Sequence, residues 1–175
     1  VGAGIVGLAT ARSLLLRHPG CSIVVFDKER EIGFHQTGHN SGVIHSGVAY
    51  QPGSEKASLC VEGARLLLEF CADHDIAVRR RGKLIVAIND QELDALAAIE
   101  RNATDNGVPD VRRLGSAGIR EIEPAVTGIA ALHVPATAVV DFRQVARALG
   151  AEVTAAGGSI VLGSDCSREE WQEGV

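Results

Sequence analysis

Three glycines at the start of the chain have the spacing that a dinucleotide-binding turn requires. The sequence runs Gly2-x-Gly4-x-x-Gly7, and a stretch with helical periodicity follows it. Gly2 permits a tight turn, Gly4 lets a pyrophosphate approach the backbone, and Gly7 allows the helix to pack closely. The unpaired N–H groups at the start of that helix attract phosphate. Asp27 ends the next apolar stretch, where a carboxylate accepts hydrogen bonds from ribose hydroxyls. The alternative, a glycine-rich turn without a ligand, is disfavoured. The glycines are followed by a helical stretch and then by a strand that ends at Asp27, which is the order found in dinucleotide-binding folds.

A second polar stretch, residues 35–47, combines histidines, glycines and small hydroxyl and amide residues. This composition suits a chain that lies flat against a large polar ligand. Two alternatives are a purely structural loop and a metal site built from His35, His39 and His45. Glycines between these histidines argue against one helical face, and no cysteine or carboxylate joins them. We therefore expect no metal.

Apolar periodicity, caps and breakers predict the elements that position these residues. Ser54 and Asp141 are expected N-caps, and Asn89 with Glu92 forms an expected capping box. Gly63 lies inside a predicted helix, so we expect a close neighbour there. The run from Arg79 to Arg81 is interpreted as a solvated turn, with an anion contact as the alternative. Helices are expected over 5–17, 55–74, 89–106, 116–123 and from 142 to about 156, and strands over 22–26, 82–88, 111–114, 128–135, 138–141 and 159–162.

The order of these elements predicts an α/β fold with a parallel sheet that a mixed α+β segment interrupts. The first part of the dinucleotide-binding domain is expected at 1–81, the insertion at 82–141, and the second part at 142–175. The strand that precedes such a glycine turn is represented only by Val1. We therefore expect a chain that is cut at its start. Because it stops at Gly174-Val175, where a new strand would begin, we expect a cut at its end as well.

Composition narrows the classes of function. The chain has 175 residues and a net charge of −5, so it has no general attraction to nucleic acid or anionic membranes. No apolar run reaches the length of a transmembrane helix. Its cysteines, Cys21, Cys60, Cys71 and Cys166, are scattered without a C-x-x-C pair. This spacing indicates a reducing compartment, and we expect a cytoplasmic protein.

The second polar stretch, His35-Gln-Thr-Gly-His-Asn-Ser-Gly-Val-Ile-His-Ser-Gly47, resembles the flavin-contacting segment of the FAD-dependent oxidoreductases of the D-amino-acid oxidase superfamily. Within that superfamily the chain is most similar to the L-2-hydroxyglutarate dehydrogenase/oxidase family. Further residues carry this resemblance: Tyr50, Pro52-Gly53, Leu59-Cys60, Glu62-Gly63, Gly82 to Val86, Ile122 to Pro124, Leu132 to Pro135 and Val140-Asp141.

The resemblance implies FAD as cofactor and a Rossmann-like fold. It assigns the glycines to the pyrophosphate, Asp27 to the ribose, residues 37–42 to the ribityl chain and flavin ring, and residue 166 to adenine through its backbone. His45 is the candidate proton acceptor, with a structural role as the alternative and a covalent flavin link left open. The implied cofactor-binding residues are Gly2, Gly4, Gly7, Asp27, Lys28, Thr37, His39, Asn40, Ser41, Gly42 and Cys166.

The same resemblance implies oxidation of an L-2-hydroxy acid, L-2-hydroxyglutarate by family, to the 2-keto acid through hydride transfer to flavin N5. The electron acceptor would be a quinone or oxygen, and association with the inner face of a membrane is an open alternative. The isolated chain is expected to be inactive, because the family's remaining substrate-binding residues lie beyond Val175. Two other functions stay open: a flavin oxidoreductase for glycerol-3-phosphate or an amine or amino acid, and a non-catalytic dinucleotide-binding module.

Overall fold

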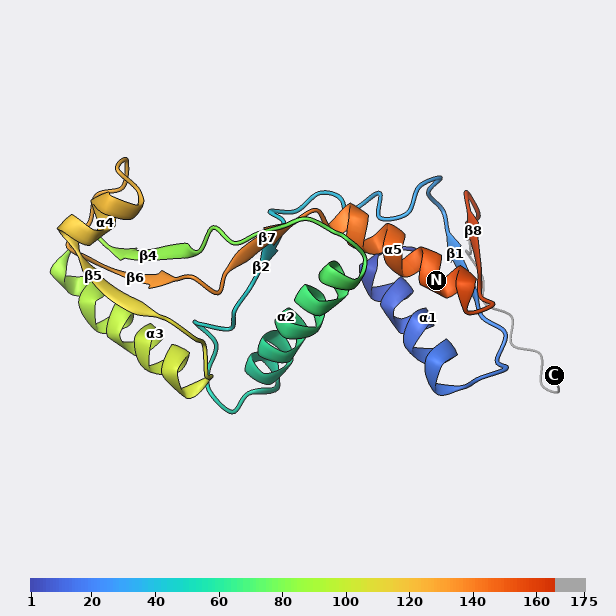
Figure 1. Cartoon of the computed structure of the whole chain (residues 1–175), viewed down its shortest axis with the longest axis horizontal. Helices are drawn as coiled ribbons and strands as arrows, with labels where there is room; N and C mark the ends of the chain where they lie inside the picture. The colour runs from blue at the N-terminus through green and yellow to red at the C-terminus, as the bar shows by residue number, and fades with distance from the viewer. Residues whose placement is uncertain (166–175) are drawn as a thin grey trace. The chain divides into compact units, whose positions relative to one another are not determined.

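The computed structural model describes residues 1–165, and their contacts divide the chain into two compact units. Unit 1 contains Val1–Gly42 and the segment from Asp141 onward, and unit 2 contains Val43–Val140. Figure 1 follows the chain through both units. Unit 2 is therefore an insertion between two segments that fold together.

Unit 1 is built from two βα segments that are far apart in the sequence. Its elements are α1 (Ile5–Arg17), β1 (Val24–Asp27), α5 (Phe142–Ala155) and β8 (Ser159–Leu162). Strands β1 and β8 pair in parallel, with Val24 opposite Ser159 and Asp27 opposite Leu162. The predicted parallel sheet is confirmed, and Figure 1 shows its strands beside α1 and α5.

Helices α1 and α5 pack against each other to form the core of unit 1. Helix α1 buries Leu8, Ala11 and Leu15, and α5 buries an apolar stripe at helical spacing. Arg12 of α1 also forms an ion pair with Glu152 of α5. The buried stripe of α5 consists of Val145, Ala146, Leu149, Gly150 and Val153.

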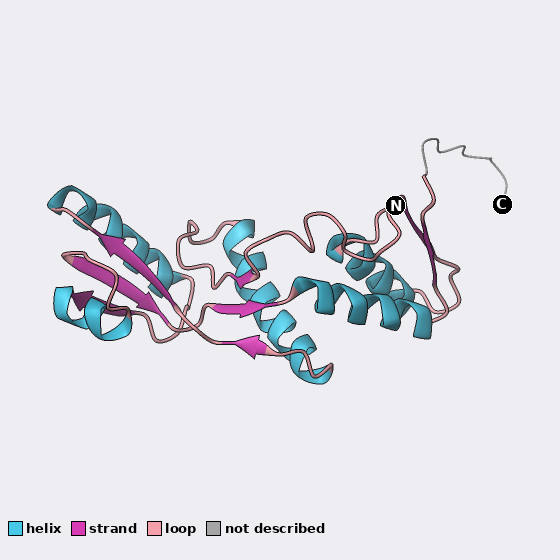
Figure 2. Cartoon of the chain, turned by 90° about the horizontal axis from the view of Figure 1, so that it is seen from above, coloured by secondary structure: helices cyan, strands magenta, loops and turns pink. Residues whose placement is uncertain are grey.

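Unit 2 contains two antiparallel sheets. The first has the strand order β2-β7-β3, with β2 at Val43–Ile44, β7 at Ala138–Val140 and β3 at Val78–Arg79. The second has the order β4-β6-β5, with β4 at Lys83–Ala87, β6 at Ala130–Val134 and β5 at Arg112–Gly115. Its helices are α2 (Glu55–Asp73), the short 3-10 helix η1 (Asp90–Glu92), α3 (Leu93–Asp105) and α4 (Ser116–Ile122). Figure 2 shows α3 running alongside the second sheet.

The core of unit 2 lies between α3 and this second sheet. Leu96 and Ala103 of α3 belong to buried clusters that contain Leu132 and Val134 of β6. Because side chains alternate along a strand, the residues between these on β6 face the other side of the sheet. His133 therefore stands on the face opposite the α3 core.

Two caps agree with the sequence prediction and one does not. The Ser54 hydroxyl accepts a hydrogen bond from the Ala57 N–H at 3.2 Å, and an Asp141 carboxylate oxygen accepts one from the Arg143 N–H at 2.9 Å. The Asn89 side chain caps nothing, and the predicted helix begins instead with the 3-10 turn η1. Glu92 accepts from the Ile88 N–H, which satisfies the amide before the turn.

Strands β2 and β3 were not predicted, because each has two residues and exists only through pairing with β7. This pairing explains why the contacts divide the chain after Gly42, whereas the sequence suggested a boundary after residue 81. Gly63 has no neighbour within 4 Å of a Cβ position among the described residues, so the expected close contact is absent there. Leu59 and Leu66 of the same helix are 72% and 50% exposed, so its predicted apolar face is largely uncovered within residues 1–165.

None of the helices within residues 1–165 has both the length and the apolar composition that crossing a membrane needs.

Candidate cofactor-binding site

The glycine turn has the conformation that its three glycines predict. Gly2 has a φ of 103°, in the left-handed region that favours glycine, and its N–H donates to the Phe26 carbonyl at 2.7 Å. A Cβ at Gly7 would overlap the Gly2 carbonyl oxygen. Helix α1 therefore starts directly against the turn, and only glycine fits at position 7.

Asp27 lies at the end of β1 and reaches the same turn. One carboxylate oxygen accepts a hydrogen bond from the Ala3 N–H at 2.6 Å, and the other accepts one from the Glu29 N–H at 2.9 Å. Each carboxylate oxygen has a further lone pair, and the side chain is only partly buried. Asp27 is thus held in position by backbone amides and can still accept hydrogen bonds from sugar hydroxyls.

Thr37 brings the second polar stretch to the N-terminus of α1. Its hydroxyl oxygen accepts a hydrogen bond from the Ile5 N–H at 3.1 Å. A Cβ at Gly4 would lie 3.2 Å from the same oxygen, so the small residue allows this approach. Gly4 is the N-cap residue and has no side chain with which to cap the helix. A hydroxyl, the helix dipole and backbone N–H groups therefore converge at one point, which suits a bound phosphate.

A groove of about 780 Å³ opens at this point and lies entirely within unit 1. Its polar end contains the glycine turn, Gln36, Thr37 and Asn40. The other end is apolar and runs along α1 and β1 past Leu14 and Ile23. Only the polar end has the chemistry for a pyrophosphate.

Two further predicted residues stabilise the loop that carries Thr37. The Asn40 amide nitrogen donates to the Gln36 and Thr37 carbonyls at 2.8 Å, and its oxygen accepts from the Gly42 N–H at 2.7 Å. His39 bonds through Nδ1 to the His35 carbonyl. These contacts shape the loop, and a direct contact of either side chain with the cofactor stays a prediction.

The remaining predicted residues divide between the units. Lys28 and Ser41 are exposed in unit 1, and His45 is exposed in unit 2, where its carbonyl accepts a hydrogen bond from the Cys60 thiol. Cys166 lies outside the described residues. Within residues 1–165, no three His, Cys, Asp or Glu side chains are grouped so that they could hold a metal ion.

Sequence reasoning missed the part that α5 plays in this loop. A Cβ at Gly38 would collide with the Arg143 guanidinium, so the loop and the start of α5 lie in close contact. Phe142, the first residue of α5, also lines the groove. The sequence separates the two segments by about a hundred residues, and only the glycine at position 38 hints at a close neighbour.

The whole chain, residues 1–175, matches the family model described as "DAO: FAD dependent oxidoreductase". It is 49% identical over 161 residues to the mitochondrial L-2-hydroxyglutarate dehydrogenase of Homo sapiens, covering 92% of this chain and 35% of that protein. It is 43% identical over 156 residues to the protein of the same name from Dictyostelium discoideum, covering 88% of this chain and 35% of that protein. The chain thus spans about a third of the length of these relatives.

Solved structures with the same fold share less sequence. The FAD-bound L-alpha-glycerophosphate oxidase of Mycoplasma pneumoniae superposes with a TM-score of 0.85 at 22% identity, covering 95% of this chain and 44% of that one. A glycine oxidase from Geobacillus kaustophilus superposes with a TM-score of 0.80 at 20% identity, covering 93% of this chain and 45% of that one. At these identities the likeness establishes the fold.

Proposed function

Because the chain belongs to the family of FAD-dependent oxidoreductases, we propose that the whole protein oxidises L-2-hydroxyglutarate to the 2-keto acid with FAD as cofactor. The observation that carries this proposal is the 49% identity to a relative named L-2-hydroxyglutarate dehydrogenase, over nearly the full chain. The polar end of the unit 1 groove supports it. The glycine turn, the Asp27 carboxylate and the N-terminus of α1 have the arrangement that a dinucleotide needs.

In this proposal, the glycine turn and the first N–H groups of α1 bind the pyrophosphate together with Thr37. Asp27 accepts hydrogen bonds from the ribose, and Lys28 lies beside it. Loop residues His39 to Gly42 line the path toward the flavin ring, held by the hydrogen bonds of Asn40. The residues present therefore fit the cofactor that the family uses.

When bound, FAD supplies an acceptor for the hydride that leaves C2 of the substrate. Oxidation of the alcohol also releases the hydroxyl proton, and a side chain has to accept it. We assign this role to a ring nitrogen of His45, because an exposed imidazole can accept a proton and the family resemblance implies a position near the flavin. Replacement of His45 by alanine is expected to lower kcat with little change in flavin content. Unchanged turnover would remove His45 from the mechanism.

Anaerobic reduction of the flavin tests the substrate directly. The full-length protein is mixed with L-2-hydroxyglutarate, its D-enantiomer, glycerol-3-phosphate or an amino acid, and the oxidised flavin absorbance is followed. We expect bleaching by L-2-hydroxyglutarate alone. Bleaching by another candidate would assign the protein to a different reaction of the same family, and a bound flavin that none of them reduces would favour a non-catalytic module.

The electron acceptor and the location belong to the proposal as well. We expect a quinone or oxygen to reoxidise the flavin, in the cytoplasm or at a membrane face. Reoxidation rates with a soluble quinone and with oxygen distinguish the two acceptors. The relatives described above are named as mitochondrial proteins, so cell fractionation of the native protein tests the location.

A further inference from the structure

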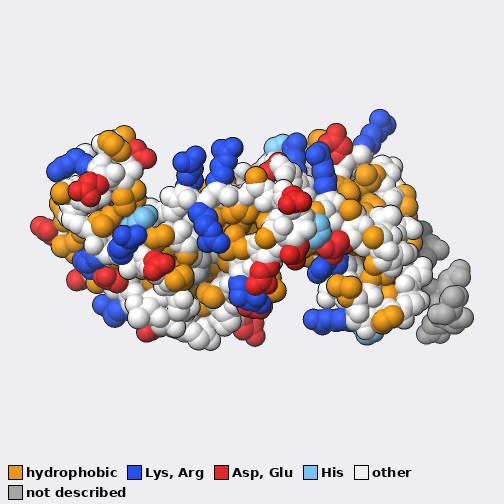
Figure 3. Space-filling model, in the orientation of Figure 1, with side chains coloured by type: hydrophobic (Ala, Val, Ile, Leu, Met, Phe, Trp, Pro, Cys, Tyr) orange, Lys and Arg blue, Asp and Glu red, His pale blue; other side chains and the backbone are white. Residues whose placement is uncertain are grey.

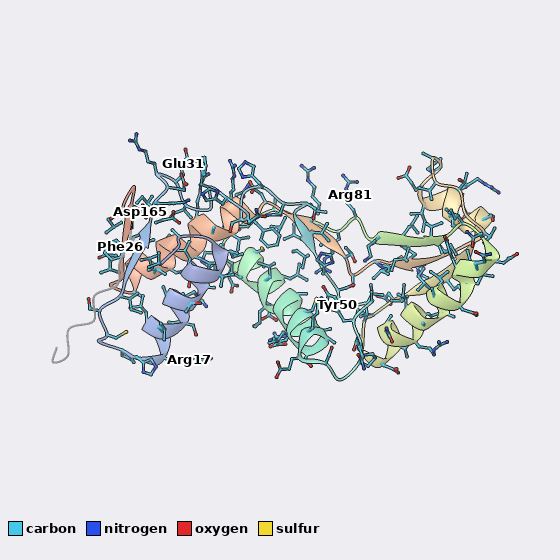
Figure 4. All side chains as sticks on the ribbon, turned by 180° about the vertical axis from the view of Figure 1, so that it is seen from behind. Arg17, Phe26, Glu31, Tyr50, Arg81 and Asp165 are labelled. Atoms are coloured by element: carbon cyan, nitrogen blue, oxygen red, sulfur yellow. The ribbon has the colours of Figure 1, made fainter. Side chains whose placement is uncertain are left out.

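A basic groove in unit 2 shares no lining residue with the groove of unit 1. It measures about 410 Å³ and lies between the loop that joins β3 to β4, the end of β6 and the turn before β5. Figure 3 shows Lys and Arg side chains gathered over the junction of β4 and β7, and Figure 4 labels Arg81 at this junction. Its lining residues are Arg80, Arg81, Gly82, Pro109, Asp110, His133, Pro135 and Ala136.

The backbone fixes the loop that carries the two arginines. The Arg81 N–H donates to the Arg79 carbonyl at 3.1 Å, and the Gly82 N–H donates to the Thr137 carbonyl at 3.0 Å. Gly82 has a φ of 69°, and a Cβ at this position would lie 2.9 Å from the His133 Nε2 atom. The positive φ favours glycine at this position, and the missing side chain lets the loop pass close to the imidazole, so Arg80 and Arg81 leave the backbone near His133.

The charged groups of the groove favour an anion. Two arginines line it against one aspartate, Asp110, and Arg112 lies directly across the strand pair from His133. Among residues 1–165, no carboxylate forms an ion pair with Arg80, Arg81 or Arg112. Other arginines of the chain do have such partners, such as Arg113 with Glu100. Planar guanidinium groups bind carboxylates in a two-pronged geometry.

His133 adds a hydrogen-bonding group, because its ring forms no hydrogen bond with another residue within 1–165. Burial lowers the pKa of this imidazole, and the nearby positive charge of Arg112 lowers it further. A neutral ring at neutral pH donates one hydrogen bond from its protonated nitrogen. Two cations and one neutral donor thus surround a cavity large enough for a small organic acid.

We propose that this groove binds a carboxylate group of a small dicarboxylic acid, through Arg80, Arg81 and His133. The choice of a dicarboxylic acid depends on the proposed function, whereas the anionic character of the ligand depends on the groove alone. The carboxylate comes either from the distal end of the substrate or from a second dicarboxylate that binds apart from it. Both sources present the same chemical group.

Titration calorimetry of the full-length protein with glutarate tests the site, because glutarate has both carboxylates and no hydroxyl to oxidise. The double variant Arg80→Gln/Arg81→Gln is expected to weaken glutarate binding about 10-fold or more, since charge-assisted hydrogen bonds are lost. Arg79→Gln is the matched control, because it removes the neighbouring charge of the same run but does not line the groove. Replacement of both arginines by lysine keeps the charge and loses the planar fork, so an intermediate affinity is expected.

Three results would overturn the proposal: no binding of glutarate by the unaltered protein, equal affinity of the double variant, or an equal loss in Arg79→Gln. Kinetics with two substrates identify the source of the carboxylate. If the double variant raises KM for L-2-hydroxyglutarate but not for the monocarboxylate L-2-hydroxybutyrate, the groove holds the substrate. If glutarate binding is lost and both KM values stay unchanged, the groove holds a separate dicarboxylate. A protein that oxidises neither substrate refutes the proposed function, while the calorimetry still decides the groove.

Discussion

The two proposed ligand sites, one in each unit, are formed by different kinds of group. In unit 1 the candidate site consists mainly of backbone groups, namely glycine turns, amides and a helix N-terminus, with Asp27 and Thr37 as supporting side chains. In unit 2 the proposed groove consists of side chains, two arginines and a histidine, on a frame of antiparallel strands. A backbone site tolerates few changes at its glycines, whereas a side-chain site can be altered one charge at a time.

Gly7→Val is expected to abolish FAD binding and to lower the melting temperature strongly. The new side chain would occupy the space of the Gly2 carbonyl and push α1 away from the turn. Flavin absorbance of the purified full-length protein and thermal unfolding measure both effects. Gly63→Ala is the matched control, because Gly63 is also helical but has open space around it among the described residues. This control is expected to be neutral or to stabilise by about 0.5–1 kcal/mol. Wild-type flavin content in Gly7→Val would refute the backbone model of unit 1.

Asp27→Ala is expected to raise the Kd for FAD about 10-fold or more. Removal of the carboxylate leaves the Ala3 and Glu29 amides without their acceptor, at a cost of about 1–3 kcal/mol for buried groups. Quenching of flavin fluorescence during reconstitution of the apoprotein measures this Kd. Glu31→Gln removes an exposed acid from the same connection and serves as control. Equal affinities of the two variants would mean that Asp27 contributes only general charge.

His133 is expected to titrate below 6.5 in the folded full-length protein, because burial and then Arg112 disfavour the imidazolium. The unfolded chain therefore binds this proton more readily, and the stabilising contribution of neutral His133 is lost as the pH falls through 6.5 toward the folded pKa. Histidine NMR signals during a pH titration report the value directly. Glutarate in the groove is expected to raise it, since an anion favours the charged ring. A pKa at or above 6.5 without glutarate would contradict the packing around β6.

The rates at which cysteines are alkylated are expected to differ least, and they compare the two units in the unaltered protein. Cys21 of unit 1 is exposed, whereas Cys71 of unit 2 is buried. Burial raises the pKa of the Cys71 thiol and of the Cys60 thiol, although the Gly47 backbone and nearby lysines partly oppose this rise at Cys60. At pH 7.5 the fraction of reactive thiolate is therefore reduced at both. Peptide mapping after brief alkylation is expected to find Cys21 labelled before Cys60 and Cys71, the other cysteines within residues 1–165. Faster labelling of Cys71 would show that unit 2 opens more readily than its packing indicates.

The sequence predicted unit 1 well because its information is local. Helix α1 and strand β8 begin and end at the residues that periodicity indicated, and Asp141 caps α5 as expected. The Ser54 cap of α2 in unit 2 is equally local and was also predicted. The glycine turn was predictable for the same reason. Gly2 has a positive φ, and Gly7 packs against the carbonyl of Gly2 only five residues away. The agreement extends to the parallel pairing of β1 with β8.

The less predictable features depend on contacts between distant parts of the chain. Strands β2 and β3 are too short to have a periodicity of their own and are defined by β7. The run of arginines suggested a turn, and nothing local indicated that His133, some fifty residues later, would lie beside it. The close contact of Arg143 with Gly38 has the same origin. In each case the pairing of segments decides which side chains meet.

The hydrogen bonds of Asp27 have a consequence for the rate at which a nucleotide is captured. Both carboxylate oxygens are fixed by amides of the fold itself, so the rotamer of the side chain is already set. In the proposed site a ribose hydroxyl would meet an acceptor that is already oriented, and preorganisation of this kind lowers the entropic cost of association. If Asp27 binds the ribose as proposed, we expect no side-chain search to precede capture at this corner of the site.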